Sequence, residues 1–159
     1  MSYGKIDFGE LYRRHLCRHS EWGINVWHLV AVLGIYFALL MLARWLPRPE
    51  WIVGLASAAY LIMLAFTVPT RVWCVCCVMV AALAGAAFSL PLLPWWVPPI
   101  AFVVLHRFQI WQHRIYSRAH DMAEFADKYR KGPKLSALLA IYELPILLNY
   151  LLFAETIKK

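Results

Sequence analysis

Six histidines fall into two groups near opposite ends of a sequence of 159 residues. The groups are His15, His19 and His28, followed much later by His106, His113 and His120. Imidazole nitrogens are common ligands of iron, zinc and other transition metals, so two such groups that meet in space could hold a metal ion. Their meeting depends on the elements that position them.

The spacing within each group favours a shared helical face. His15 and His19 are four residues apart, which places them about one turn apart on a helix. His106, His113 and His120 recur every seven residues, and a straight helix drifts by only about 20° per heptad, so they form one stripe. For any single histidine the alternative is an ordinary residue at a membrane boundary, and His120, in a polar stretch, fits that alternative best.

The composition indicates an integral membrane protein. Hydrophobic residues make up 62% of the chain and charged residues 16%, and the mean hydropathy is +0.58. These values lie beyond the usual apolar share of a soluble domain. The length and the lack of a linker or repeat predict a single membrane domain over residues 1–159.

Four apolar stretches are each about as long as a membrane-crossing helix, which needs roughly 20 residues. They cover residues 26–46, 51–68, 72–93 and 95–111, and prolines mark the breaks between them. A fifth stretch, residues 135–153, either crosses as well or packs as a kinked helix against the others. The predicted fold is an all-α integral membrane helical bundle with four spans and a fifth, C-terminal helix.

Lysine and arginine concentrate at one set of span ends. Arg13, Arg14 and Arg18 precede the first stretch, Arg71 lies between the second and third, and seven basic residues follow the fourth within residues 107–134. The positive-inside rule then predicts a cytoplasmic N-terminus, in a bacterial inner membrane or the endoplasmic reticulum, with both histidine groups at that face. The basic residues that give the net charge of +7 lie mainly at the ends of the spans. This arrangement favours contact with anionic lipid headgroups and gives no reason to expect a nucleic-acid partner.

Two further groups allow more than one interpretation. Cys74, Cys76 and Cys77 begin the third stretch, where they could be thiolate ligands or small residues at a helix interface. Glu143 lies inside an apolar run, so it must be protonated, paired or bound to a metal. Alternatively, Glu143 satisfies the free amide groups of a half-helix that starts at Leu144 and Pro145.

Two short motifs resemble those of the membrane-bound 2-hydroxy fatty acid dioxygenases of fungal phytosphingosine breakdown and their bacterial relatives. The first motif runs from the region of Tyr12 through His19 and Asn25 to His28, and the second is Gln109, His113 and Tyr116. The resemblance covers about the first 35 residues and the region after His106. Asn25 and His28 are separated by two intervening residues where the family usually has three, and Gln112 and Ser117 replace a glycine and an acidic residue of the family pattern.

The resemblance implies iron(II) chemistry in which dioxygen shortens a 2-hydroxy fatty acid, or a similar lipid, by one carbon. The ligands expected for the metal are His15, His19, His28 and His113, with His106 or Glu143 next. The catalytic residues expected are His113, Glu143 and Tyr116. The residues expected to bind the substrate are Arg18, Arg107, Arg114, Asn25 and Gln109.

Three other functions are compatible with the histidines. A zinc hydrolase of lipid amides would use a similar ligand set, with a metal-bound water as nucleophile. A non-catalytic scaffold or haem-binding membrane protein would use histidines of facing helices as axial ligands. A di-iron desaturase fits less well, because that family normally needs about eight histidines in HxxxH and HxxHH boxes. The sequence leaves the oligomeric state open.

Overall fold

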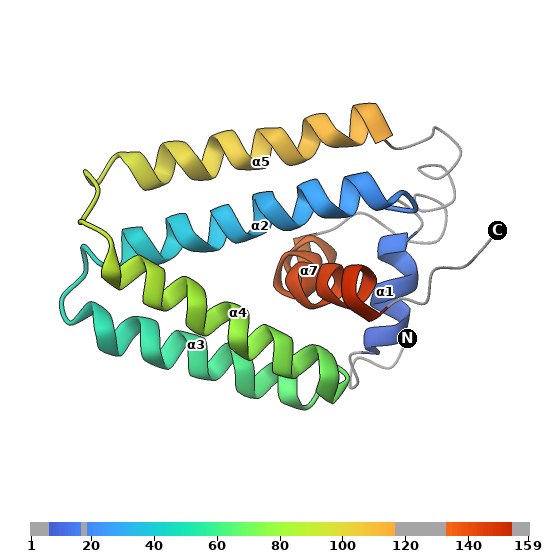
Figure 1. Cartoon of the computed structure of the whole chain (residues 1–159), viewed down its shortest axis with the longest axis horizontal. Coiled ribbons are helices and arrows are strands. Elements are labelled where there is room, and N and C mark those ends of the chain that lie inside the picture. Colours follow the sequence, from blue (N-terminus) through green and yellow to red (C-terminus); the bar gives the residue numbers. More distant parts are fainter. Residues whose placement is uncertain (1–6, 17–18, 117–132, 154–159) are drawn as a thin grey trace.

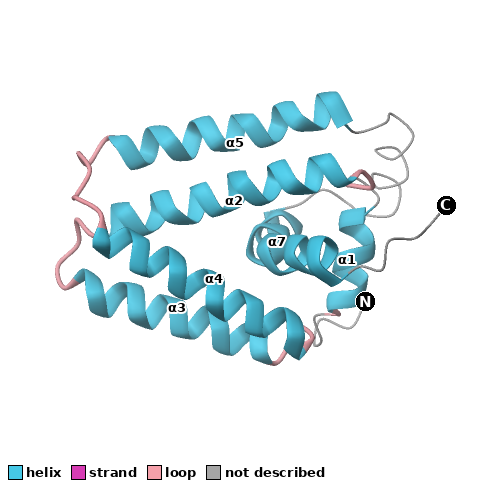
Figure 2. Ribbon diagram, in the orientation of Figure 1, coloured by secondary structure: helices cyan, strands magenta, loops and turns pink. Residues whose placement is uncertain are grey.

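A computed structural model describes residues 7–16, 19–116 and 133–153. Within these ranges every regular element is an α-helix and no strand occurs (Figure 2). The helices are α1 (Phe8–Leu16), α2 (Trp22–Ala43), α3 (Pro49–Ala65), α4 (Thr70–Ser89), α5 (Val97–Tyr116) and α7 (Pro133–Phe153). The predicted all-α class is therefore confirmed.

Helices α2, α3, α4 and α5 lie lengthwise beside one another and alternate in direction (Figure 1). Short turns at both ends of this layer join them. Helix α2 packs most closely on α5 and also contacts α3, α4 and α7. The start of α2 and the end of α5 consequently lie at the same end of the layer, next to α1 and α7.

Proline and its neighbours determine where several helices begin and end. Helix α3 begins at Pro49, in the first turn, where the missing N–H has no helical partner to lose. Helix α4 ends at Ser89 because Leu90, which precedes Pro91, is extended with ψ 154°. The expected end of this helix at residue 93 is therefore wrong. The Arg44 guanidinium donates hydrogen bonds to the carbonyl oxygens of Ala87, in the last turn of α4, and Leu90, just beyond it, at 2.7 and 2.8 Å.

Helix α5 accommodates Pro98 and Pro99 in its first turn and continues to Tyr116, five residues beyond the expected boundary at residue 111. This extension places His106 and His113 on the same helix. Helix α2 begins at Trp22, earlier than the expected residue 26. His28 therefore lies in the second turn of α2.

Among the helices that the structure describes, only α2 and α4 are long and apolar enough to cross a membrane. Helix α3 has 17 residues, and at 1.5 Å per residue it is about 26 Å long, short of a hydrocarbon core of about 30 Å. The second half of α5 carries basic and polar side chains. All four expected stretches form helices, but four clear spans are not confirmed.

Helix α7 contacts α1, α2 and α4. Figure 1 views it nearly along its axis, so it crosses the direction of the four-helix layer. Tyr142, Leu144, Ile146 and Leu147 are fully buried, as expected for a helix surrounded by others. Pro145 removes the N–H that would bond to the Ile141 carbonyl. The Tyr60 hydroxyl donates to that carbonyl at 3.0 Å instead, which ties α3 to α7.

The close packing of α2 on α5 depends on Gly34. A Cβ atom at this position would lie 2.7 Å from the Cδ1 atom of Leu105. Gly54, on α3, has no atom within 4 Å of the equivalent position. Gly34 thus lets the two histidine-bearing helices approach each other.

Candidate metal centre

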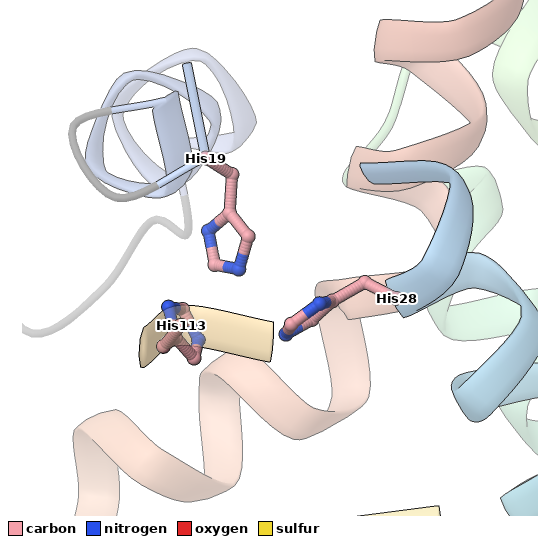
Figure 3. Close-up of side chains that lie close together, drawn as sticks. All are labelled: His19, His28 and His113. Carbon is pink, nitrogen blue, oxygen red and sulfur yellow. The ribbon is translucent and has the colours of Figure 1, made fainter. Parts of the chain in front are cut away.

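His19, His28 and His113 converge on one point (Figure 3). One ring nitrogen of each lies within 4.8 Å of the corresponding nitrogens of the other two. The ring centroid of His19 lies 4.5 Å from that of His28 and 4.7 Å from that of His113. The ring centroids of His28 and His113 are 5.0 Å apart. Three imidazoles at this separation could hold a metal ion.

The three histidines come from three separate segments. His19 lies in the connection between α1 and α2, His28 in the second turn of α2, and His113 in the last turn of α5. The packing of α2 on α5 brings His28 close to His113. His19, just before α2, lies beside them at the same end of the bundle. The prediction that the two histidine groups meet is therefore confirmed by these three residues.

His19 has a free metal-ligating atom in a buried position. Its Nδ1 lies 3.1 Å from the backbone oxygen of His15, which can only accept, so Nδ1 carries the proton. The Nε2 atom then keeps its lone pair, is buried and has no hydrogen-bond partner among the described residues. A buried lone pair without a donor is costly, and a metal ion among the three rings would satisfy it.

Burial lowers the pKa of His19 well below the usual 6.5, and the neighbouring imidazoles of His15, His28 and His113 lower it further. The hydrogen bond to the His15 carbonyl opposes this shift only in part. His19 is therefore neutral at physiological pH, which is the form that binds metal.

Asn25 fixes the backbone at His19. Its Nδ2 donates to the carbonyl oxygens of His19 and Glu21, both at 2.8 Å, and its Oδ1 lies 3.1 Å from Nε2 of His15. The side chain is fully buried and does not line the cavity at the histidines. In this structure Asn25, expected from the sequence to bind substrate, holds the backbone at His19 and the ring of His15.

His15 stacks on His19 with ring centroids 3.8 Å apart and planes 3° apart. The four-residue spacing predicts this contact. The His19 N–H bonds to the His15 carbonyl at 3.0 Å, the hydrogen bond between residues four apart that a helical turn makes. The Nε2 of His15 is engaged by Asn25, and His15 is not one of the three converging histidines although it lines the same cavity.

Glu143 approaches the three histidines from α7. Its Oε1 lies 4.0 Å from Nε2 of His28 and accepts a 3.2 Å hydrogen bond from Nε2 of Gln109. Helix α7 runs through Glu143 without a break, so the alternative of a half-helix start at this residue is wrong. The carboxylate is paired, as its position in an apolar run requires.

His106 lies on the same stripe of α5 as His113 but about 10 Å away along the helix, given a rise of 1.5 Å per residue. Its exposed ring stacks on Phe102 at 6.4 Å. Both His106 and His113 line the same cavity, as the heptad spacing predicts. His106 does not belong to the converging group.

Arg107, Arg114 and Tyr116 do not line the cavity at the three histidines. The side chains of Arg107 and Arg114 are exposed on α5. Tyr116 packs beside Gly23, where an added Cβ would lie 3.2 Å from its ring. Arg18 and His120 lie outside the described residues.

The cysteines belong to another part of the bundle. Cys76 is fully buried in the core between α4 and its neighbours, Cys77 is half-buried and Cys74 is exposed. None of the three belongs to the group of converging ligands. This location agrees with a packing role for Cys76.

A cavity of about 500 Å³, here called the metal-side cavity, extends from the histidines between α2, α5 and α7. Its polar end contains His15, His19, His28, His113, Gln109 and Glu143. Its other end is apolar and is lined by Val32, Ile35, Tyr36, Leu39, Phe102 and Leu139. A ligand with a polar head and an apolar tail matches this division.

No family model, curated protein or solved structure matches this chain. The resemblance to the 2-hydroxy fatty acid dioxygenases therefore rests on the short motifs alone. The functional argument depends on the geometry of the site.

Two features of the site have no counterpart in the motifs. Tyr36 lines the cavity from within an apolar run, where its hydroxyl is the only polar signal. Gln112 is fully buried beside His113, and neither of its amide atoms has a hydrogen-bond partner among the described residues. A polar residue next to a ligand in a helix is the signal that could have identified Gln112.

Proposed function

We propose that this protein is a membrane enzyme that uses iron(II) and dioxygen to shorten 2-hydroxy fatty acids by one carbon. The observation that carries this proposal is the convergence of His19, His28 and His113 at the polar end of an otherwise apolar cavity. The motif resemblance supplies the reaction type, and the geometry supports a metal and a lipid.

The donor set fits a ferrous ion. Three imidazoles converge from three segments, and an ion held by these three ligands would keep other coordination positions for dioxygen and substrate. Bound there, iron(II) would supply a centre at which dioxygen and the hydroxyl and carboxylate of the acid come together. The buried lone pair of His19 Nε2 is the feature of this chain that such an ion satisfies.

The surrounding residues hold this arrangement in place. The carbonyl of His15 fixes the tautomer of His19, and Asn25 fixes the backbone that presents the ring. Gln109 orients the carboxylate of Glu143 towards the cavity. Glu143 is then placed to accept the proton of the substrate's 2-hydroxyl, the role of a general base.

The membrane and the arginines position the substrate. Helices α2 and α4 cross the bilayer, with the metal centre at the cytoplasmic face. The acyl chain lies along the apolar wall that Val32, Ile35 and Leu39 form. Arg107 and Arg114, next to His106 and His113 in sequence, draw the acid's carboxylate to this end.

A zinc-dependent lipid hydrolase is the second candidate, because the converging set contains imidazoles only. Three histidines with an open fourth position form a common catalytic zinc site. Glu143, 4.0 Å from His28, would then activate the attacking water. A haem site is less well supported, since three rings with centroids at most 5.0 Å apart leave no space for a macrocycle between them.

Oxygen uptake distinguishes the two enzymes. Protein purified without oxygen and loaded with iron(II) is given 2-hydroxyhexadecanoic acid, with hexadecanoic acid as the matched substrate control. We expect uptake with the hydroxy acid only, and one molecule of the acid shortened by one carbon for each dioxygen consumed. Uptake that does not depend on the hydroxyl, or no uptake, would overturn the proposal, and amide hydrolysis by zinc-loaded protein would favour the hydrolase.

The Glu143→Gln variant tests the role of the carboxylate. The amide keeps the size of the side chain and an oxygen for Gln109, but it is not a base. We expect bound iron to stay near the wild-type amount while turnover falls by about 10²-fold or more. Equal turnover of variant and wild type would remove Glu143 from the mechanism.

A further inference from the structure

A second cavity adjoins the metal-side cavity. This distal cavity, of about 390 Å³, lies between α2, α3, α4 and α7. It is lined by Tyr36, Leu39, Leu40, Ala56, Ser57, Tyr60, Val80, Leu83, Ala140 and Ile141. Tyr36, Leu39 and Ala140 also line the metal-side cavity, so the two spaces share one wall and meet at these residues.

We propose that the two cavities form one path for a single acyl chain, and that the distal cavity determines how long a chain the protein accepts. The inference rests on the proposed function for the identity of the head group, a 2-hydroxy acid at the histidines. The path itself depends only on the arrangement of the helices.

The residues that line the path on α2 follow helical spacing. His28, Val32, Tyr36 and Leu39 lie on one face of the helix, starting at the metal centre and ending at the distal cavity. From His28 to Leu40 the helix rises by roughly 18 Å, the length of about 14 extended methylene groups. A shorter chain would end within the metal-side cavity.

Two tyrosines form the junction between the cavities. The rings of Tyr36 and Tyr60 meet edge to face with centroids 6.3 Å apart. Their hydroxyls turn to the backbone of α7, where Tyr36 binds the carbonyl of Ala140 at 3.4 Å and Tyr60 that of Ile141 at 3.0 Å. Because the polar atoms are engaged by α7, the rings offer an apolar wall to a passing chain.

The lining and the opening of the distal cavity favour a hydrocarbon occupant. Apart from the hydroxyls of Ser57, Tyr36 and Tyr60, the side chains that line it are apolar. Leu39 is 48% exposed and Ile141 38% exposed at its edge, so the space opens sideways between the helices. With α2 and α4 in a bilayer, that opening faces lipid, and a chain can enter without crossing water.

Photolabelling locates the chain end without relying on turnover. The full-length protein, in lipid nanodiscs, is incubated with 2-hydroxy acids of eight or sixteen carbons that carry a diazirine at the terminal carbon. After irradiation, mass spectrometry identifies the labelled residues. We expect the long probe to label the distal cavity, on α3 around Ser57 and Tyr60 and on α4 around Val80 and Leu83, and the short probe to label the metal-side cavity.

The Ser57→Phe variant fills the distal cavity, and Ala58→Phe adds the same side chain on the same helix outside it. We expect Ser57→Phe to lower the ratio of long-probe to short-probe labelling at least tenfold, and Ala58→Phe to leave that ratio unchanged. An equal effect of both variants, or a long probe that labels the lipid-facing sides of all helices alike, would overturn the inference.

These outcomes are separate from those of the proposed reaction. Labelling of the distal cavity by the long probe, in protein that consumes no dioxygen, would keep the acyl path and reject the dioxygenase. Dioxygen consumption with identical labelling patterns for both probe lengths would keep the dioxygenase and reject the path.

Discussion

The side-chain amide of Asn25 donates a 2.8 Å hydrogen bond to the backbone carbonyl of His19. This bond joins the first turn of α2 to a ligand that lies outside any helix. The same amide group bonds to the carbonyl of Glu21, so both of its hydrogens are used. The position of the His19 ring therefore depends on a residue that is not itself one of the converging histidines.

Replacement of Asn25 by alanine tests this dependence. The Asn25→Ala variant removes three hydrogen bonds, to the carbonyls of His19 and Glu21 and to the ring of His15, which costs about 2–4 kcal/mol of stability. We expect metal affinity to fall at least tenfold as His19 loses its fixed position. Competition with a chelating dye measures the affinity, and Val30→Ala, at an exposed position of α2, is the control. Wild-type affinity in Asn25→Ala would refute the bracing role.

The site could be predicted from the sequence in its location but not in its details. The alternation of apolar stretches places the start of α2 and the end of α5 at one end of the bundle, and with them His28 and His113. Which histidines converge depends on how the helices and their side chains pack. His106 and His113 lie about two turns apart on α5, and of these two only His113 belongs to the converging group. Helical spacing predicts the stripe on α5 but cannot show how far along it the metal lies.

The C-terminal helix shows a second limit of the sequence. The apolar run from residue 135 to residue 153 fits either a span or a packed helix, because both are apolar all round. The structure places α7 in contact with α1, α2 and α4, where it is buried around Tyr142 and Ile146. This burial depends on neighbours distant in sequence, which periodicity does not reveal.

Tyr60 is expected to stabilise the proline-containing region of α7. In Tyr60→Phe the carbonyl of Ile141 loses its donor, while Pro145 still cannot supply one. We expect a loss of about 1–2 kcal/mol in the free energy of unfolding. Tyr36→Phe, which removes a longer bond of 3.4 Å, should cost less. Denaturation in detergent compares the two, and an equal or reversed order would contradict this explanation.

The contact between α2 and α5 at Gly34 predicts a position-specific effect of added side chains. Valine at Gly34 must displace Leu105, whereas valine at Gly54 meets open space. We expect Gly34→Val to be less stable than Gly54→Val by about 1–3 kcal/mol. Because the same contact sets the spacing of His28 and His113, metal affinity should fall in Gly34→Val only. Thermal unfolding and metal titration of both variants provide the measurement, and matching values would rule out a special role for Gly34.

The depressed pKa of His19 predicts that the metal-free protein loses stability in mild acid. In the unfolded chain His19 takes up a proton as the pH falls through about 6.5, but in the folded protein burial keeps it neutral to a much lower pH. The unfolded state then binds more protons, so the stability present above pH 6.5 decreases below it. Thermal unfolding of metal-free protein between pH 8 and pH 5 should show this decrease, and His19→Gln should show a smaller one. An identical pH dependence in the variant would contradict the assignment.

Metal content tests the central claim most directly. Protein purified without oxygen is analysed by mass spectrometry as wild type and as the variants His19→Ala, His113→Ala and His106→Ala. We predict about one metal ion per wild-type chain, its loss in the first two variants, and its retention in His106→Ala, whose ring lies about two turns from the converging group. Retention of the metal in both His19→Ala and His113→Ala would show that these imidazoles do not form a metal centre.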